Sequence, residues 1–341
     1  MLCLTLVLWF AGASTALAAR LPDHLHKGFV FTSWWNDAYE SPKAADSLAQ
    51  MKATHPNSVA FIVTWYTHDL KSNMIYRHPD STPSDHSMRE IVARAKSMGL
   101  RTFLRPVVDS YSGGWRGVYQ PADPQAWFAD YRRFIFHYAE LAESMDVDLF
   151  SVGMEYKSMT IPAYSRKWRS IIAGVRKRFT GKLTYGGVMG DRVNWWAALD
   201  YVGVDWYMQL ARPGESTSLS VRELLARWSR FTDEYHIRHN YLRELARLSA
   251  RWRKPIIFNE VGFPSRREGL FAPFNATVGP ANVEVQARAF RAMFRALRGR
   301  KWLKGLYVWE WFYDDARFGP GDPSHSPQNK LAEATLRTWF R

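Results

Sequence analysis

The sequence predicts a single-domain α/β fold, a (β/α)8 TIM barrel, and the alternation of two hydrophobic periods along the chain is the main reason. Eight short and almost continuously apolar runs occur at residues 28–35, 59–66, 101–109, 149–155, 183–188, 201–208, 255–262 and 303–311. Between them, apolar residues recur at three- and four-residue spacing, which is typical of amphipathic helices. Near-continuous apolar strands indicate a parallel sheet buried on both faces, and eight strand–helix units favour a closed barrel.

The helical segments follow the strands in order, and we expect one after each strand. The clearest are residues 41–55, 87–100, 127–145, 163–179 and 282–299, with a final helix over 330–340. Residues 213–254 have room for two helices, and residues 265–281 are rich in proline and glycine. Long loops are expected after the third, sixth and seventh strands. An open doubly wound sheet is the alternative, but no G-x-G-x-x-G motif follows the first strand, which ends in Ser33-Trp34-Trp35.

The N-terminal residues read as a signal peptide, residues 1–19, which leaves residues 20–341 as one domain without a linker. The run MLCLTLVLWFAGASTALA is apolar and ends in Ala16-Leu17-Ala18, a small-x-small pattern before a cleavage site. It lacks the basic residues with which signal peptides usually begin. It is also short for a helix that spans a membrane. A retained membrane anchor is the alternative. We expect an exported protein, periplasmic or secreted, with no stable membrane span after cleavage.

Composition and charge narrow the classes of function. The chain has 341 residues, 47% hydrophobic, and a formal net charge of +14, which suggests anionic surroundings. The basic residues are scattered through helices such as residues 163–179, and no nucleic-acid-binding signature is present, so nucleic acid is not the expected partner. Cys3 is the only cysteine, so the mature chain has no disulfide, cysteine nucleophile or cysteine-bound metal. We expect a monomer.

Two glutamates stand at the ends of otherwise apolar strands. Glu155 ends the run LFSVGME, and Glu260 lies near the end of PIIFNEVG. In such barrels the chemistry lies at the C-terminal ends of the strands, so both side chains are expected to converge at the mouth. Two carboxylates facing one bond are what glycoside hydrolysis requires, because one donates a proton and the other stabilises positive charge on the sugar carbon. Their proximity is expected to keep one protonated and the other ionised.

Aromatic and polar residues at the same strand ends are candidate sugar contacts, because flat sugar faces stack on rings while hydroxyls need polar partners. The candidates for substrate binding are Trp35, Trp65, Arg105, Asp109, Asp205, Trp206, Tyr207 and Trp309. Tryptophans on helical stretches, such as Trp127 and Trp168, are assigned to core packing instead. No histidine cluster lies at these ends, since His24 and His26 precede the first strand, so no metal and no cofactor is expected.

Over about residues 28–318, the chain resembles glycoside hydrolase family 113, β-mannanase-like members of the large clan of retaining (β/α)8 glycosidases. The matching segments are SWWNDAYESPKAADSLAQM, VTWYTHD, RPVVDS with the following WRG, VGMEYKS, ALDYVGVDWY and KPIIFNEVGFPS. The resemblance implies that Glu155 is the general acid/base and Glu260 the nucleophile. It also implies that Tyr207 holds the nucleophile and that Trp309 forms the floor of a sugar subsite. Arg105 and Asp109 would contact sugar hydroxyls or tune the glutamates.

The chain departs from the clan pattern just before the acid/base. Many clan members place an asparagine there, where it binds the sugar 2-hydroxyl, but this chain has Met154. An Asn-Glu pair occurs at Asn259-Glu260 instead, on the strand expected to carry the nucleophile. Either another group binds the 2-hydroxyl, or the substrate differs from that of the family.

The resulting hypothesis is a retaining β-glycoside hydrolase acting on a β-linked polysaccharide or oligosaccharide, with endo-β-1,4-mannanase-like activity. The positive charge leaves open an anionic substrate. One alternative is a catalytically silent glycan-binding barrel in envelope or exopolysaccharide assembly, and another is a β-glycosidase with a different sugar specificity. A metal-dependent hydrolase is disfavoured by the absence of a histidine cluster at the strand ends.

Overall fold

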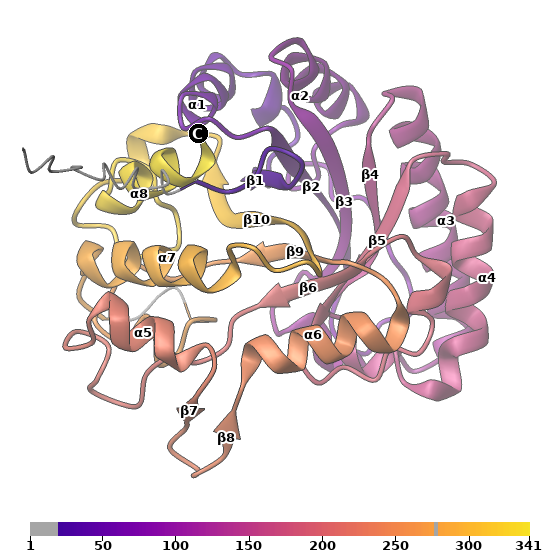
Figure 1. Ribbon diagram of the computed structural model, residues 1–341. Coiled ribbons are helices and arrows are strands. Elements are labelled where there is room, and N and C mark those ends of the chain that lie inside the picture. Colours follow the sequence, from indigo (N-terminus) through magenta and orange to yellow (C-terminus); the bar gives the residue numbers. More distant parts are fainter. Residues whose placement is uncertain (1–19, 276–278) are drawn as a thin grey trace, which may run out of the picture.

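The computed structural model describes residues 20–275 and 279–341, and its centre is a closed barrel of eight parallel strands (Figure 1). The strands are β1 (His26–Thr32), β2 (Ser58–Thr67), β3 (Arg101–Ser110), β4 (Leu149–Met154), β5 (Lys182–Val188), β6 (Val202–Trp206), β9 (Ile256–Val261) and β10 (Leu303–Phe312). Around the barrel they follow the order β1-β10-β9-β6-β5-β4-β3-β2, and β1 closes it by pairing with both β2 and β10. The predicted (β/α)8 barrel is confirmed.

Helices surround the barrel (Figure 1). They are α1 (Pro42–Lys52), α2 (Asp85–Ser97), α3 (Pro124–Ser144), α4 (Ser165–Arg176), α5 (Val221–Arg227), α6 (Tyr241–Trp252), α7 (Val283–Leu297) and α8 (Leu331–Phe340). Several begin at caps that the sequence carries. The Ser41 side chain accepts a hydrogen bond from the backbone of Ala44, and Asp123 caps α3 in the same way. Such caps satisfy amide groups that the first helical turn leaves unpaired.

The connection between β5 and β6 differs from the prediction. We expected a helical segment after every strand, but only a three-residue 3-10 helix, Trp196–Ala198, lies between these two. The predicted pair of helices after the sixth barrel strand is present as α5 and α6, with a small hairpin, β7 (Phe231–Thr232) and β8 (Arg238–His239), between them. The flank of β5 and β6 is therefore covered by α6 rather than by a helix of its own.

The hydrophobic core has two parts. The larger part packs the outer surface of the strands against the helices. The smaller part fills the inside of the barrel with side chains such as Val30, Ile62, Phe103 and Tyr307. Because all eight strands run in parallel, their C-terminal ends lie together at one end of the barrel, which we call the mouth, and their N-terminal ends lie together at the other, which we call the base.

Two further predictions concern the N-terminal signal peptide and membrane spans. The predicted signal peptide, residues 1–19, lies outside the described residues. Within the part of the chain that the structure describes, none of the helices combines the length and the apolar character that crossing a bilayer requires.

Candidate active site

Glu155 and Glu260 meet at the mouth of the barrel. Glu155 directly follows β4, and Glu260 lies in β9, opposite Asp205 of β6 in the strand register. One carboxylate oxygen from each of Glu155, Asp205 and Glu260 lies within 4.8 Å of the other two. Glu155 has a φ of 57°, a left-handed conformation that is uncommon for residues other than glycine. Its backbone amide donates to the carbonyl of Gly186 at 2.7 Å, which anchors this turn to β5.

Glu260 is held at both carboxylate oxygens. Arg105 Nη2 lies 2.8 Å from Oε1, and the Tyr207 hydroxyl donates to Oε2 at 2.6 Å. Arg105 is fully buried, and its Nη1 also donates to the backbone carbonyl of Asn259 at 3.0 Å, which fixes the guanidinium beneath the site. Burial raises the pKa of Glu260, whereas the Arg105 charge acts in the opposite direction and Glu155 adds to the rise. This arrangement fixes the position of the Glu260 carboxyl group at the mouth of the barrel.

Glu155 has a different set of partners, which come from the loop after β3. Its Oε2 accepts hydrogen bonds from Arg116 Nη1 at 2.9 Å and from the Trp115 indole at 3.1 Å. Arg116 is also bound by Asp109, through Nε at 3.0 Å and Nη2 at 2.7 Å. Arg116 therefore links the carboxylates of Asp109 and Glu155.

Asp205 is buried beneath the two glutamates. Neither of its carboxylate oxygens has a hydrogen-bond partner among the described residues, and Oδ1 is 3.6 Å from Arg105 Nη2. Burial and the nearby Glu260 charge raise its pKa well above the ordinary value. A side chain on the neighbouring Gly186 would approach Asp205 Oδ2 to 2.4 Å, so this glycine makes room for the carboxyl group.

Two predicted sugar contacts do not reach the cleft, and we correct them. Trp65 lies against α3, where its indole nitrogen donates to the Tyr138 hydroxyl at 2.7 Å and its ring contacts Phe134. Trp206 is fully buried and stacks on Trp228 with ring centroids 4.3 Å apart. Both side chains point from the barrel wall toward the helices, so they stabilise the outer core.

Trp35 and Trp309 do lie at the mouth. Trp35 is 43% exposed and packs against Phe312 and Tyr313. Trp309 is partly buried above the inner core, with its ring centroid 6.4 Å from that of Trp34 in an edge-on contact. Aromatic surfaces are thus available on the β1 and β10 side of the mouth, across the barrel from Glu155 on β4.

A third glutamate, Glu310, lines a cavity of about 410 Å³ on this aromatic side. Thr32 donates to Glu310 Oε2 at 2.8 Å. The other lining residues are Trp34, Trp35, Phe312, Arg317, Phe318, Asp322 and Ser324. Burial raises the pKa of Glu310 to about 7, opposed by the Thr32 hydrogen bond, while the charges of Glu260 and Asp322 raise it and that of Lys330 lowers it.

The raised pKa of Glu310 predicts a pH-dependent loss of stability. Its pKa is about 7 in the folded protein against 4.5 as the ordinary value, so its contribution is complete below pH 4.5 and is lost as the pH rises toward 7. We expect the unfolding free energy of the wild type to fall, relative to Glu310→Gln, by at most about 1.4 kcal/mol per pH unit in this window. Urea unfolding of both proteins between these pH values measures the difference, and parallel curves would contradict it.

Sequence reasoning missed four residues of this mouth: Trp34, Trp115, Arg116 and Glu310. A signal was present for each of them. Trp34 and Glu310 flank the strand-end candidates Trp35 and Trp309, and Trp115-Arg116-Gly117 belongs to a segment that resembles the family. What was missing was the path of the loop after β3, which brings Trp115 and Arg116 back over Glu155.

Comparison with known proteins gives the family. The model of Glycoside Hydrolase Family 113 matches residues 28–318. The chain belongs to glycoside hydrolase family 113. None of the curated proteins compared with it matches. The predicted resemblance and the predicted enzyme class, a glycoside hydrolase, are confirmed.

Solved structures agree with this assignment. The chain is similar to the GH113 β-mannanase AaManA from Alicyclobacillus acidocaldarius in complex with ManMIm, with 25% identity and a TM-score of 0.81 over 93% of this chain and 97% of that one. A second GH113 structure, a β-1,4-mannanase, gives 26% identity and a TM-score of 0.78 over 93% and 99%. A β-glucuronidase from Ruminococcus gnavus, at 13% identity and a TM-score of 0.56 over 93% of this chain and 50% of that one, shows the fold alone.

Met154, the departure from the clan pattern, lies inside the barrel of this family 113 chain. It is 2% exposed and belongs to the inner core, with its sulfur 3.7 Å from Arg105 Nη2. The Asn259 side chain is also fully buried, and its amide lies beside Gly203 and away from solvent. Neither buried side chain is exposed at the mouth to bind a sugar 2-hydroxyl, which leaves either another group at the mouth or a different substrate.

The three acidic residues at the mouth could in principle hold a cation, since their oxygens lie so close together. Two guanidinium groups already occupy this position: Arg105 pairs with Glu260, and Arg116 pairs with Glu155. A cation bound between the carboxylates would have to displace or oppose both. The donor set therefore fits an ion-pair network better than a metal site.

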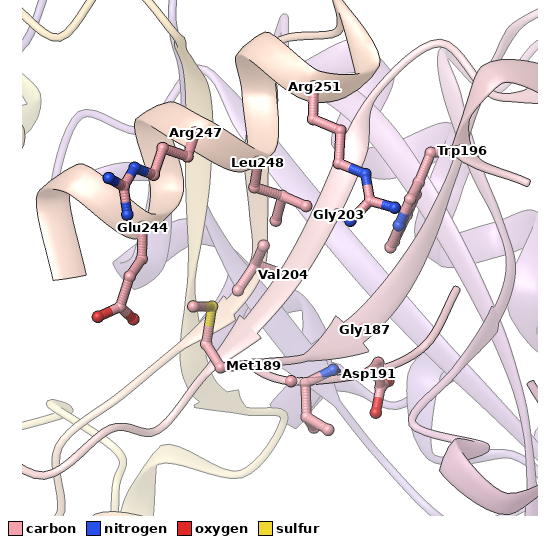
Figure 2. Close-up of a pocket in the computed structure, with 12 residues that line it drawn as sticks. Gly187, Met189, Asp191, Trp196, Gly203, Val204, Glu244, Arg247, Leu248 and Arg251 are labelled. Carbon is pink, nitrogen blue, oxygen red and sulfur yellow. Dashed lines mark hydrogen bonds between the residues drawn. The ribbon is translucent and has the colours of Figure 1, made fainter. Parts of the chain in front are cut away.

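A separate cavity of about 350 Å³ opens on the flank of the barrel where the β5–β6 connection lacks a helix (Figure 2). Gly187 and Gly203 of the strands form one wall, and Leu248, Arg247 and Arg251 of α6 form another. Burial raises the pKa of Asp191, at its edge, to about 6. This cavity lies on the outer side of the strands and does not include either catalytic candidate.

Tyr207 offers a direct test of the contacts around Glu260. In Tyr207→Phe, Glu260 loses the hydrogen bond to Oε2 and keeps only its ion pair with Arg105, and a hydrogen bond to a charged group is worth about 1.5–3 kcal/mol. We therefore expect kcat/KM to fall by roughly 10- to 100-fold. Tyr235→Phe, which changes an exposed tyrosine, is the matched control. A normal rate in Tyr207→Phe would remove the role assigned to this hydroxyl.

Proposed function

We propose that this glycoside hydrolase is a retaining enzyme that cleaves β-1,4-mannan or a closely related β-linked glycan, with Glu260 as nucleophile and Glu155 as general acid/base. The observation that carries the proposal is the approach of Glu155 and Glu260 oxygens to within 4.8 Å. Retaining enzymes hold their two carboxyl groups about 5–5.5 Å apart, whereas inverting enzymes leave about 6.5–9.5 Å for a water molecule.

The contacts of the two glutamates support these roles. Glu260 is held by Arg105 and Tyr207, which favours an ionised and fixed carboxylate. In the first step its oxygen would bond to the anomeric carbon while Glu155 gives its proton to the departing glycosidic oxygen. In the second step Glu155 would take a proton from water, whose oxygen attacks the same carbon and releases Glu260.

The aromatic side of the mouth supports a glycan substrate. On the ring of strands, β10 with Trp309 and Glu310 lies opposite β4, and Glu155 follows β4. The leaving group must lie near the proton donor, so the cavity lined by Trp34, Trp35 and Glu310 is the place for sugars on the other side of the cleaved bond. The likeness to two β-mannanases supports mannan as the substrate.

Product analysis tests the proposal. The protein is incubated with mannan, glucomannan, xylan, β-glucan, galactan and an acidic exopolysaccharide, and the anomeric configuration of the first product is followed by NMR. We expect oligosaccharides from mannan with the β-anomer appearing first. An α-anomer appearing first would contradict the retaining mechanism, and release from another polymer alone would contradict the proposed sugar.

We also propose that the protein acts outside the cytoplasm as a monomer, after removal of residues 1–19. The apolar N-terminal run and its Ala16-Leu17-Ala18 end support export. Fractionation of the expressing cells, with N-terminal sequencing of the exported form, measures both the compartment and the cleavage point. A cytoplasmic protein that begins at Met1 would contradict this proposal.

A further inference from the structure

The positive charge of the chain is concentrated in one part of the sequence. Residues 243–304 contain fourteen lysines and arginines against four acidic residues, in a chain whose formal net charge is +14. One of the four acidic residues is the buried Glu260. This stretch comprises α6, β9, α7 and the start of β10. The catalytic contacts described above use none of its lysines and arginines.

These basic residues gather at the base of the barrel, opposite the mouth. Helices α6 and α7 run back toward the base and end at Trp252 and Leu297, because each is followed by a strand that starts there. The basic residues at and just after these two ends form what we call the basal patch: Arg251, Arg253, Lys254, Arg295, Arg298, Arg300, Lys301 and Lys304.

Two further cations lie at the base but are not counted in the basal patch: Arg101 and Lys182, the first residues of β3 and β5. Lys182 is paired with Asp200. Arg101 donates to the backbone carbonyl of Leu25 at 3.0 Å. His26, the first residue of β1, has its pKa lowered to about 3 by burial, with the charges of Arg101 and Lys304 adding to the effect. Arg101 and Lys304 therefore both lie close to the start of β1.

The basal patch is left open to an external partner. Six of its side chains are exposed: Arg251, Arg253, Arg295, Arg298, Arg300 and Lys301. Among residues 20–275 and 279–341, no member of the patch forms a salt bridge, whereas Arg176, Arg227 and Arg337 on other helices are each paired with an acidic residue. Cations near a helix C-terminus stabilise the helix through its dipole. This effect does not account for Lys301 and Lys304, which lie beyond the end of α7.

The path of the chain indicates which anionic partner fits. The described chain starts at Arg20, and the backbone amide of Leu21 donates to the carbonyl of Trp339, near the end of α8. Helix α8 packs against α7, so Arg20 enters at the same end of the barrel as the basal patch. The apolar residues 1–18 precede it in sequence, so before their removal during export the base is the end of the barrel next to the membrane. A cluster of basic residues at that end is attracted to anionic lipid headgroups.

We propose that the basal patch binds a bilayer surface that contains anionic phospholipids. Bound in this way, the barrel presents its base to the lipid headgroups and its mouth to the surrounding medium. The attraction is electrostatic, so it weakens as added salt shortens the screening length. The proposal rests on the distribution of charge and does not depend on the catalytic roles assigned to Glu155 and Glu260.

Vesicle co-sedimentation tests the proposal with the exported form of the chain, which begins at residue 20. The vesicles are made of phosphatidylcholine alone or of phosphatidylcholine with phosphatidylglycerol. The variant Arg298→Gln, Arg300→Gln, Lys301→Gln removes three exposed charges from the patch. The control Arg89→Gln, Arg132→Gln, Arg222→Gln removes three exposed charges from α2, α3 and α5. Thermal unfolding of all three proteins checks that they are folded.

We expect salt-sensitive binding of the wild type to the phosphatidylglycerol vesicles, weakened roughly a hundredfold in the basal variant and nearly unchanged in the control. Equal binding to neutral vesicles, or an equal loss in both variants, would overturn the proposal. A third arm replaces the vesicles with polygalacturonate. Equally tight binding of this polymer, with the same loss in the basal variant, would assign the patch to soluble polyanions and overturn the lipid assignment.

Discussion

Replacing Glu260 with alanine is expected to abolish hydrolysis of mannan while leaving the barrel folded. The variant has no carboxylate to bond to the anomeric carbon, and Arg105 and Tyr207 lose the group that they hold in place. We expect kcat to fall by about 10⁴-fold or more, which corresponds to at least about 5 kcal/mol of transition-state stabilisation. Release of reducing sugar from mannan, followed over days for the variant, is the measurement.

The control for this experiment is Glu90→Ala, which removes an exposed glutamate from α2. Thermal unfolding of both variants separates lost catalysis from lost structure, because the loss of Glu260 leaves Arg105 buried without its main partner. A folded Glu260→Ala protein that still cleaves mannan at the wild-type rate would exclude Glu260 as the nucleophile.

Replacing Glu155 with alanine is expected to give a loss that depends on the leaving group. General acid catalysis contributes about 10²- to 10⁴-fold, and a sugar leaving group needs the whole of it. An acidic phenol leaves without a proton, so formation of the glycosyl–Glu260 intermediate from an aryl mannoside should be much less affected. Rates on mannan and on aryl mannosides of graded phenol pKa measure this dependence.

The second step of the reaction provides an independent test of Glu155. Without it, water attacks the intermediate without a general base, so the intermediate should accumulate. Azide is already ionised and can attack the anomeric carbon directly, which forms a glycosyl azide and frees Glu260. We expect added azide to raise the turnover of Glu155→Ala on aryl mannosides and to give the β-glycosyl azide, whereas direct attack by azide in Glu260→Ala would give the α-glycosyl azide. An equal loss on all leaving groups, with no effect of azide, would contradict the acid/base role.

The fold could be predicted from the sequence because the barrel strands are buried on both faces. Runs such as residues 59–66 are apolar throughout, and this pattern indicates a parallel sheet covered by helices. The same property explains the wrong predictions at Trp65 and Trp206. When both faces of a strand are apolar, alternation does not show which side chains point inward, and both of these point toward the helices.

The catalytic candidates could be located because a charged residue at the end of an apolar strand is conspicuous. Arg105, Tyr207 and Trp309 are candidates because they also stand at strand ends. The structure places all three around the mouth. The partners of Glu155 could not be located in this way. Trp115 and Arg116 lie on an irregular loop whose course depends on glycines with positive φ, Gly113 at 91° and Gly114 at 95°, and on contacts made only in the folded chain.

The missing helix between β5 and β6 shows a further limit. The segment between these strands is short and carries aromatic residues, and Trp195 and Trp196 pack with Tyr185 instead of continuing a helix. An amphipathic pattern is informative only where enough residues exist to repeat it. Here the connection is too short, and α6 from the next unit covers the exposed flank.

The loop after β3 supplies the hydrogen-bond partners of Glu155, the proposed proton donor. Trp115 is 45% exposed and bonds to Glu155, while Arg116 beside it joins Glu155 to Asp109. The ring of Trp115 lies over Gly117, where a β-carbon would approach it to 2.4 Å. A substitution in this loop, such as Gly117→Ala, would therefore shift the two donors to Glu155 without changing Glu155 itself. Relatives that differ in this loop would place different partners around the same two glutamates.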